Sequence, residues 1–500
     1  MRIYGLVLGV LLFGMPVELV AAEVQAAVDF PALERRWENA RKVMGLPGVS
    51  IAIVQGNEVV YEHGFGHRSV EPKVAFTPQT PSYVASVTKT FTGFAIMQLV
   101  DDGKVRLDVP VVTYLPRFQL SDADLTARIT VRDLLCHRYG LSNWPIGFAE
   151  AYSGLCDDDF FYRELPHTNI KGTWEYDNLH FTLLGRVVEA VSGQPWQEYL
   201  RDHVFVPAGM TRTTGRASEL YAFADVAQPL TFENGTWAPA TLRKHDTTMH
   251  AAGGLGSSVG DLATWIRLHL NGGVVDSKRL LSEAGIQEIL MPQVNPDTEF
   301  WRFGRKQMGL AWYLGDYKDD LLVHHFGSYI GAHAHVSFMP QHKIGVAVIA
   351  NSDEDMSMFV HRMTADVYDA FLGRPLEDSM QGFAESMRDI AARQAEQDEP
   401  RRRKLNLPLP LKTYAGVYNS EQWRTLVLEV RDDTLVGHVG QLEFVLFRDQ
   451  SGEIRADSSL GDQPFQFSES NGAISEACIG KESNIMRFVR EAIGSPPTVF

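Results

Sequence analysis

The sequence predicts an α+β protein, in which helices flank an antiparallel sheet and a small antiparallel β-barrel follows near the C-terminal end. Three observations support this prediction. Hairpin patterns occur near both ends of the first 375 residues, segments with helical spacing lie between them, and short alternating strands occupy residues 411–500. Hairpins together with separate helices favour an α+β sheet over a doubly wound parallel sheet.

The expected sheet begins with a hairpin and ends with three strands. Residues 49–54 are rich in β-branched side chains and form the first strand. Residues 55–57 form a turn, and residues 59–61 begin the second strand of the hairpin. Much later in the chain, alternating apolar patterns predict further antiparallel strands. These cover residues 321–325, 334–339 and 344–350, with a turn at 341–343.

Four segments carry apolar residues at helical spacing. The first runs from Ser86 to Asp102, where Gly103 ends it. Ser258 and Asp261 have the spacing of a capping box, in which each side chain binds the other residue's backbone N–H. The remaining helices are expected at 131–136 (ended by Gly140), 179–192 (ended by Gly193) and 261–270 (ended by 271–273).

The composition changes around residues 376–410. Residues 380–397 are polar with helical spacing, and a basic run at 401–404 follows. Short strands with Asp-Asp and Gly turns then predict a small antiparallel barrel or sandwich. These strands are expected at 425–430, 434–439 and 442–447. We therefore divide the chain into a signal peptide (1–22), a mixed α/β domain (28–375), a helical and basic linker (376–410) and a small β-barrel domain (411–500).

The overall charge restricts what the protein binds. The 500 residues include 46 Lys and Arg against 62 Asp and Glu, so the formal net charge is −16. Binding of nucleic acid needs a basic face, and the one obvious basic patch is 401–404. Hydrophobic residues make up 45% and charged residues 22%, which excludes a disordered or collagen-like chain. We expect no nucleic-acid partner.

Residues 1–22 have the layout of a secretory signal peptide. Arg2 precedes an apolar run at 3–15, and Ala21 and Ala22 supply the small residues for cleavage. An uncleaved anchor is the alternative, but the run is shorter than the roughly 20 residues that span a bilayer. We expect a secreted or periplasmic protein with no stable membrane span after cleavage.

Export permits disulfide bonds, but three cysteines do not specify one. Cys136 and Cys156 are candidates for a pair that leaves Cys478 over, and three unpaired thiols are the equal alternative. The sequence leaves both readings open.

Ser86 and Lys89 form the first candidate catalytic group. A serine hydroxyl becomes a good nucleophile only when a base takes its proton. On a helix, positions i and i+3 lie on one face, so the Lys89 amine can reach the Ser86 hydroxyl. The amine must be neutral to accept a proton, which requires that burial or a nearby cation lowers its pKa.

Two further triplets follow in order along the chain. Residues 176–178 (Y-D-N) precede a predicted helix; the phenol can relay a proton, and the amide can hold the lysine or an acyl-amide group. Residues 325–327 (H-F-G) lie at the end of a predicted strand. There the glycine lets a substrate lie against the strand, and the imidazole can donate to a carbonyl or carboxylate. Each triplet alone has an ordinary structural explanation, but three in order are not expected by accident.

These motifs resemble those of the serine β-lactamases and penicillin-recognising D-peptidases, which carry S-x-x-K, then Y-x-N, then K-T-G or H-x-G. The matching residues are Ser86 and Lys89, Tyr176 and Asn178, and His325 and Gly327. The resemblance covers roughly residues 30–370 and is nearest to class C β-lactamases and their esterase and D-aminopeptidase relatives. It implies a β-lactamase/transpeptidase-like domain at 28–375. The tail from Tyr414 resembles the small β-barrel appended to some of those peptidases.

The resemblance also implies a mechanism. Ser86 attacks a carbonyl carbon and forms an acyl-enzyme, which water then hydrolyses. Lys89 and Tyr176 share the role of general base, and Asn178 positions the acyl side chain. The backbone N–H groups of Ser86 and Ser328 hold the oxyanion.

His325 departs from the pattern of most β-lactamases, which have lysine there as a permanent cation for the drug's carboxylate. An imidazole is only partly charged near neutral pH. The expected function is therefore an exported serine hydrolase acting on an ester, an amide or a D-amino-acid peptide. A class C-type β-lactamase and a non-catalytic protein that binds cell-wall peptide are the alternatives. We expect a small-molecule or peptide substrate and no cofactor; the oligomeric state is open.

Two other hydrolytic patterns occur in the chain. Residues 256–260 fit G-x-S-x-G, but the segment before them is not a strand, so Ser258 is expected to cap a helix. His333 and His335 fall on one face of a predicted strand near His324 and His325. Zinc usually takes three or four ligands that include carboxylate or thiolate, so we expect histidines lining a sheet and no metal.

Overall fold

A computed structural model describes residues 28–233, 236–352, 354–376, 380–398, 404–470, 472–480 and 485–491. The expected signal peptide and the basic residues 401–403 lie outside the described residues. None of the described helices is both long enough and apolar enough to cross a membrane.

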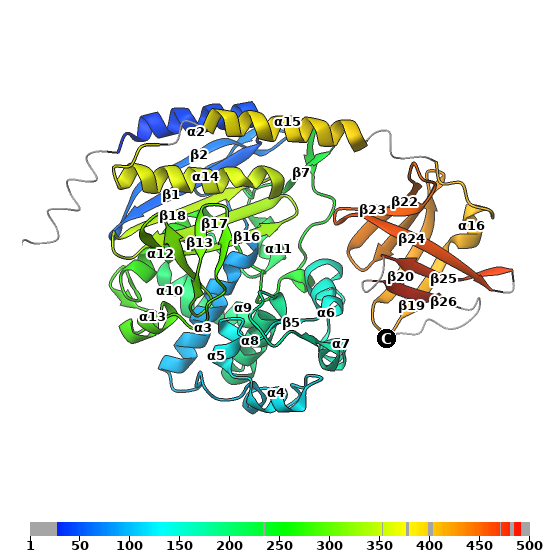
Figure 1. Cartoon of the computed structure of the whole chain (residues 1–500), viewed down its shortest axis with the longest axis horizontal. Helices are drawn as coiled ribbons and strands as arrows, with labels where there is room; N and C mark the ends of the chain where they lie inside the picture. Colours follow the sequence, from blue (N-terminus) through cyan, green and yellow to red (C-terminus); the bar gives the residue numbers. More distant parts are fainter. Residues whose placement is uncertain are drawn as a thin grey trace, which may run out of the picture.

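An eight-stranded antiparallel sheet lies at the centre of the larger part of the molecule (Figure 1). Its strand order is β14-β15-β16-β17-β18-β1-β2-β3. The first hairpin of the chain therefore lies beside the last strands, with Val49 of β1 opposite Ala350 of β18. The strands are β1 (Gly48–Gln55), β2 (Glu58–Ser69), β3 (Val74–Ala75), β14 (Gln307–Met308), β15 (Tyr313–Tyr317), β16 (Asp320–Tyr329), β17 (Ala332–Met339) and β18 (Ile344–Ala350).

Side chains of β1 enter two separate cores, one on each face of the sheet. Ile51 and Ile53 pack into a core closed by α2, α14 and α15, whereas Ala52 and Val54 pack into the core that holds α3 and α12. Figure 1 shows α2, α14 and α15 covering one side of the sheet. Successive side chains of a strand point to opposite faces, so a strand that is buried on both sides is apolar without interruption. The helices are α2 (Phe30–Met44), α3 (Thr88–Asp101), α12 (Val259–Leu270), α14 (Glu354–Phe371) and α15 (Met380–Asp398).

The predicted helices are present, but the capping box is only half formed. Ser258 Oγ accepts the backbone N–H of Asp261 at 3.2 Å. The Asp261 carboxylate instead accepts the backbone N–H of Arg212 and the hydroxyl of Thr213, both at 2.7 Å. Asp261 thus joins the helix to a neighbouring loop. The remaining helices of this part include α4 (Ala123–Arg128), α5 (Val131–Leu135), α6 (Trp144–Phe148), α7 (Asp158–Glu164), α8 (Asn178–Ser192), α9 (Trp196–Leu200), α10 (Val206–Ala208), α11 (Ala217–Ala222) and α13 (Glu283–Ile289).

The strand predicted at 321–325 is longer than expected. β16 continues to Tyr329 because β17 pairs with it along that whole stretch, with Gly327 opposite Ala334 and Ser328 opposite His333. Residues 325–327 therefore lie inside a strand and not at its end, which corrects the expectation from the sequence.

Eight further strands close into an antiparallel barrel. The barrel is joined to the larger part by direct contacts: the Gln441 N–H donates to Ser153 O at 2.9 Å, and the rings of Phe148 and Trp423 lie 5.9 Å apart. Its strands are β19 (Gly416–Ser420), β20 (Arg424–Arg431), β21 (Thr434–Val439), β22 (Leu442–Arg448), β23 (Ile454–Ser458), β24 (Gly461–Ser470), β25 (Ala473–Ile479) and β26 (Met486–Arg490).

All three cysteines are free in the structure. The pairing of Cys136 with Cys156 that the sequence left open is not formed. Cys136 is buried, and burial raises its thiol pKa to about 11, so it packs as a small apolar side chain.

Candidate active site

Ser86 is presented by a short turn at the start of α3. It is the middle residue of η1 (Ala85–Val87), a 3-10 turn that leads directly into the helix. Ala85 has φ 46°, a left-handed conformation that is strained for a residue with a side chain. Ser86 is half-buried, whereas both of its neighbours are buried. Its backbone N–H lies at the first turn of a helix, where amides lack partners within the helix.

The amine of Lys89 lies between the serine and two carbonyl oxygens. Lys89 is fully buried, and its Nζ lies 3.1 Å from Ser86 Oγ, 2.7 Å from Asn178 Oδ1 and 2.7 Å from Ala252 O. Burial lowers the pKa of Lys89 to about 7, and the nearby Asp177 carboxylate partly opposes this change. An amine with this pKa is partly neutral at pH 7 and can accept a proton.

Tyr176 lies on the other side of the same amine. Lys89 Nζ is 4.8 Å from the centre of the Tyr176 ring. Burial raises the pKa of Tyr176, although a hydrogen bond with Ser86 works in the opposite direction. The phenol is therefore protonated at neutral pH. Asp177 caps α8 by accepting the Leu179 N–H at 2.9 Å, which sets Asn178 as the first helical residue, facing Lys89.

Gly327 and Ser328 lie on β16 against the serine turn. A Cβ at position 327 would lie 2.0 Å from Val84 O and 3.0 Å from Ser86 N, so no other residue fits there without displacing the turn. Ser328, the next residue of β16, is half-buried.

His325 lies near the Tyr176 ring and is uncharged. Its ring is 6.1 Å from that of Tyr176 and it is 1% exposed. Burial, followed by the field of Lys89, lowers the pKa of His325 well below its usual value. Its Nδ1–H donates to Phe326 O at 2.8 Å, so Nε2 carries the lone pair, and that atom has no hydrogen-bond partner among the described residues. The partly charged donor expected from the sequence is thus corrected to a neutral acceptor, because the strand buries the ring.

Two groups at the site have no counterpart in the motifs. The Ala252 carbonyl is a backbone group, so no side chain marks it in the sequence. The guanidinium of Arg305 lies 4.3 Å from the centre of the Tyr313 ring, and that ring stacks 6.2 Å from Tyr176. Arg305 Nε has no hydrogen-bond partner among the described residues. Arg305 is the last residue of β13 (Phe303–Arg305) and belongs to none of the motifs, so only the fold reveals it.

The structure also shows where the residues of the G-x-S-x-G segment (256–260) and the pair His333 and His335 lie. Ser258 is fully buried and caps α12, and the segment before it, β9 (Gly256–Ser257), is a two-residue strand. His333 and His335 both contact His361, at 3.1 Å between Nε2 atoms and 2.9 Å between Nδ1 atoms. Across the described part of the chain, no three His, Cys, Asp or Glu side chains are arranged to hold a metal ion.

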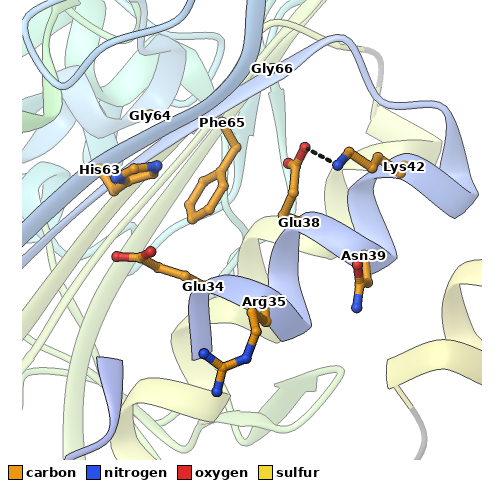
Figure 2. A pocket seen from close by; sticks show the side chains of 9 residues that line it. All are labelled: Glu34, Arg35, Glu38, Asn39, Lys42, His63, Gly64, Phe65 and Gly66. Carbon is orange, nitrogen blue, oxygen red and sulfur yellow. Dashed lines mark ion pairs between the residues drawn. The ribbon is translucent and has the colours of Figure 1, made fainter. Parts of the chain in front are cut away.

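A separate hollow of about 440 Å³ lies between α2 and β2 (Figure 2). Three of its charged groups are already engaged: Lys42 pairs with Glu38 at 3.2 Å, and Glu34 accepts the hydroxyl of Tyr61 at 3.0 Å. None of its lining residues belongs to the group around Ser86, so the hollow does not extend the candidate active site. Its lining residues are Glu34, Arg35, Glu38, Asn39, Lys42, His63, Gly64, Phe65 and Gly66.

Comparison with known proteins gives a consistent result. The Beta-lactamase family profile matches residues 36–369. Penicillin-binding protein 4 of Amycolatopsis lactamdurans is 29% identical over 346 residues, covering 66% of this chain and 87% of that protein. The fold is similar to that of the octameric penicillin-binding protein homologue from Pyrococcus abyssi (TM-score 0.59, 24% identity, 92% of this chain and 98% of that one). It is also similar to D-amino acid amidase from Ochrobactrum anthropi SV3 (TM-score 0.55, 23% identity, 68% and 99%).

Proposed function

The chain belongs to the beta-lactamase family, and on this premise we propose that it is an exported serine hydrolase that cleaves an ester, an amide or a D-amino-acid peptide through an acyl-enzyme on Ser86. Membership of the family makes the chain a hydrolase related to the serine β-lactamases and penicillin-binding proteins. The acyl-enzyme, the substrate class and export are the parts that we propose.

One observation supports this mechanism above all others: the two carbonyl acceptors beside the Lys89 amine. A neutral amine has two N–H groups and one lone pair. Asn178 Oδ1 and Ala252 O, each 2.7 Å away, accept the two N–H groups, which leaves the lone pair for the Ser86 hydroxyl at 3.1 Å. The proton of Ser86 passes to Lys89 Nζ while Oγ bonds to the substrate carbonyl carbon, whose oxygen becomes an anion.

The remaining groups complete the reaction cycle. The N–H groups of Ser86 and Ser328 stabilise the oxyanion, and each such donor typically contributes about 3 kcal/mol to the transition state. Tyr176, which starts protonated, passes its proton to the leaving group. Lys89, which holds the proton taken from Ser86, then returns a proton to Tyr176. The bond to the leaving group breaks, and water then attacks the ester by the same route in reverse.

The neutral His325 favours substrates that carry an N–H donor. Its Nε2 is a buried acceptor without a partner in the described part of the chain, so a substrate group that reaches it must be an N–H donor, such as an amine or an amide, and not a carboxylate. An amide or peptide of a D-amino acid has such groups, and D-amino acid amidase is among the proteins with a similar fold.

A second candidate is the hydrolysis of a substrate with a carboxylate, such as a β-lactam. Arg305 favours it, because this permanent cation lies near Tyr313 and Tyr176 and forms no ion pair with a carboxylate of the described residues. Arg305 would then supply the charge that lysine supplies in most β-lactamases and that His325 lacks.

The decisive experiment follows acylation of Ser86. Wild type and Ser86→Ala are incubated with a fluorophosphonate and with penicillin, and the adduct is located by mass spectrometry. p-Nitrophenyl esters, nitrocefin and D-amino-acid p-nitroanilides are then tested as substrates. We expect a label and turnover in wild type only. A label on Ser86→Ala contradicts the mechanism, and binding of cell-wall peptide without label or turnover supports the non-catalytic alternative.

Export has its own test. The full chain is expressed in a secreting bacterial host, and the N-terminus of the purified protein is sequenced. We expect the mature chain to start after Ala22. A protein that retains residues 1–22 in the membrane fraction contradicts cleavage.

A further inference from the structure

His137 and His180 form a buried pair of imidazoles beside the Tyr176 ring. Both histidines are fully buried, and their Nδ1 atoms lie 3.0 Å apart. The His137 ring is 4.7 Å from the Tyr176 ring. The mechanism proposed above uses neither histidine.

Hydrogen bonding determines which nitrogen of each ring carries the proton. His180 Nε2 lies 2.6 Å from Tyr139 O, so this nitrogen must donate. Burial lowers the pKa of His180 to about 4, so the ring is neutral and its Nδ1 carries a lone pair. His137 Nδ1 must then be the donor in the 3.0 Å contact between the rings. Two longer contacts favour the opposite tautomers: the Asp177 N–H lies 3.4 Å from His137 Nδ1, and Asp177 O lies 3.3 Å from His180 Nδ1. The much shorter 2.6 Å contact of His180 Nε2 with Tyr139 O decides between them.

His137 consequently offers an unused acceptor next to the active site. Its Nε2 carries the lone pair, points away from His180 and has no hydrogen-bond partner among the described residues. Burial lowers the pKa of His137 well below the usual value, and the nearby Lys89 amine acts in the same direction. The ring therefore stays neutral and adds no charge that would disturb the Lys89 amine.

The backbone at His137 is held in an unusual conformation. Its φ is 55°, in the left-handed region, and its carbonyl accepts the Glu175 N–H at 3.4 Å. The next turn is joined to the same segment, with the Gly140 N–H donating to Thr173 O at 2.7 Å. Strained positions of this kind persist where the surrounding structure requires them, often at functional sites. Here the strain places the His137 ring directly against the segment that carries Tyr176.

We propose that His137, fixed as the Nδ1–H tautomer by His180, is a positioning residue that holds the Tyr176 ring in the orientation required for proton transfer. This inference rests on the proposed serine hydrolase function. His137 acts through Tyr176 and makes no contact with the reacting atoms.

The test separates positioning from mere stability. The variants are His137→Phe, His137→Asn and Tyr176→Phe, and the measurement is the rate of acylation of Ser86 by the best ester or amide. We expect His137→Phe to lower this rate by about 10- to 100-fold with little change in KM, because a displaced catalytic group slows chemistry more than binding. His137→Asn should recover much of the rate, since its amide N–H can still donate to His180.

A double-mutant comparison gives the decisive result. In the Tyr176→Phe background, His137→Phe should change the rate by less than about twofold, because the group that it positions is already gone. An equal loss in both backgrounds overturns the inference, and so does an unchanged rate in His137→Phe. If His137→Phe does not fold, His180→Phe removes the same hydrogen bond without altering the strained residue, and the same loss is expected.

His269 supplies a matched control. It is also a buried imidazole with an unpartnered Nε2, and its Nδ1 lies 2.9 Å from Trp265 O, but its ring contacts are with Phe94, Trp265, Trp312 and Phe338. His269→Phe should lower the melting temperature and leave acylation unchanged. An equal loss of acylation in this variant contradicts a specific role for His137.

Nitrogen-15 NMR of the histidine side chains tests the pair without any substrate. We expect the proton on Nδ1 of His137 and on Nε2 of His180, assigned from the single variants. The reverse tautomers overturn the inference. Failure of the proposed function has a different signature, because wild type would then form no acyl-enzyme at all.

Discussion

Gly327 on β16 lies against the backbone nitrogen of Ser86. A Cβ at position 327 would come within 3.0 Å of that nitrogen and within 2.0 Å of Val84 O. The glycine of the third motif is therefore a packing requirement of the serine turn, in addition to any contact that it makes with substrate.

Gly327→Ala tests this contact. The added methyl group must displace the turn and its amide, which is one of the two proposed oxyanion donors. We expect kcat/KM to fall by about 100-fold, as on loss of one such donor, with a smaller effect on the melting temperature. Gly382→Ala in α15 is the control, because a Cβ there meets nothing within 4 Å. Equal activity of Gly327→Ala and wild type would contradict the argument.

The dependence of acylation on pH should report Lys89. Burial lowers its pKa to about 7, and only the neutral amine accepts the serine proton, so the rate should rise with pH and level off above about pH 7. Lys89→Met should abolish acylation. Lys244 is a matched control, since burial also lowers its pKa to about 7 while its Nζ donates to Ala151 O at 2.9 Å. If Lys244→Met removes the transition near pH 7, the assignment to Lys89 is wrong.

Arg305→Met distinguishes the two candidate substrate classes. Removal of the cation should raise KM for nitrocefin or penicillin by about 10-fold or more and leave D-amino-acid p-nitroanilides unaffected, since a charge-assisted hydrogen bond contributes about 1.5–3 kcal/mol. Steady-state kinetics of both substrates give the answer. Arg305→Lys is the control for charge alone. Parallel changes for both substrates would show that Arg305 only supports the fold around Tyr313.

A cluster of four buried histidines, His324, His333, His335 and His361, should make the protein sensitive to acid. Burial lowers the pKa of His324 and His333 to about 3, and that of His335 and His361 well below the usual value. Below about pH 6.5 the unfolded chain binds protons that the folded cluster does not, so stability is complete above that pH and is lost as the pH falls towards about 3.

Urea unfolding between pH 5 and 7.5 measures this effect. Each histidine contributes a slope of up to about 1.4 kcal/mol per pH unit, so His361→Phe should have a shallower dependence than wild type. Glu150, whose pKa burial raises to about 7, acts in the opposite direction in both proteins and cancels in the comparison. Identical slopes would show that the cluster titrates normally.

The contact between the barrel and the larger part depends on Gly440. Its φ is 57°, and a Cβ there would lie 2.1 Å from Ser153 O, the atom that accepts the Gln441 N–H. Gly440→Val should therefore undock the barrel, which calorimetry would detect as an earlier, separate unfolding transition. Gly452→Val carries the same left-handed strain (φ 90°) but meets nothing within 4 Å, so it isolates the contact. Equal effects of the two variants would contradict docking through Gly440.

Much of the fold was predictable because its signals are local. The hairpin at 48–61 and the helix that starts near Ser86 follow from periodicity and turn residues, which short stretches of chain carry by themselves. The limits of β16 were not predictable, because pairing with β17 extends it through Gly327 to Tyr329. Likewise, Asp261 has the spacing of a capping box but binds Arg212 and Thr213, which folding brings from elsewhere.

The sequence by itself determined the family resemblance, the candidate nucleophile and the two-part architecture, since motifs and periodicities are properties of order along the chain. Only the tertiary structure decided the protonation states. His325 is neutral, Lys89 has a pKa near 7, and His137 is held as one tautomer, because burial and partners from distant segments determine the energy of a charge. The same physical reason explains why Arg305, which no motif contains, lies beside Tyr313 at the candidate site.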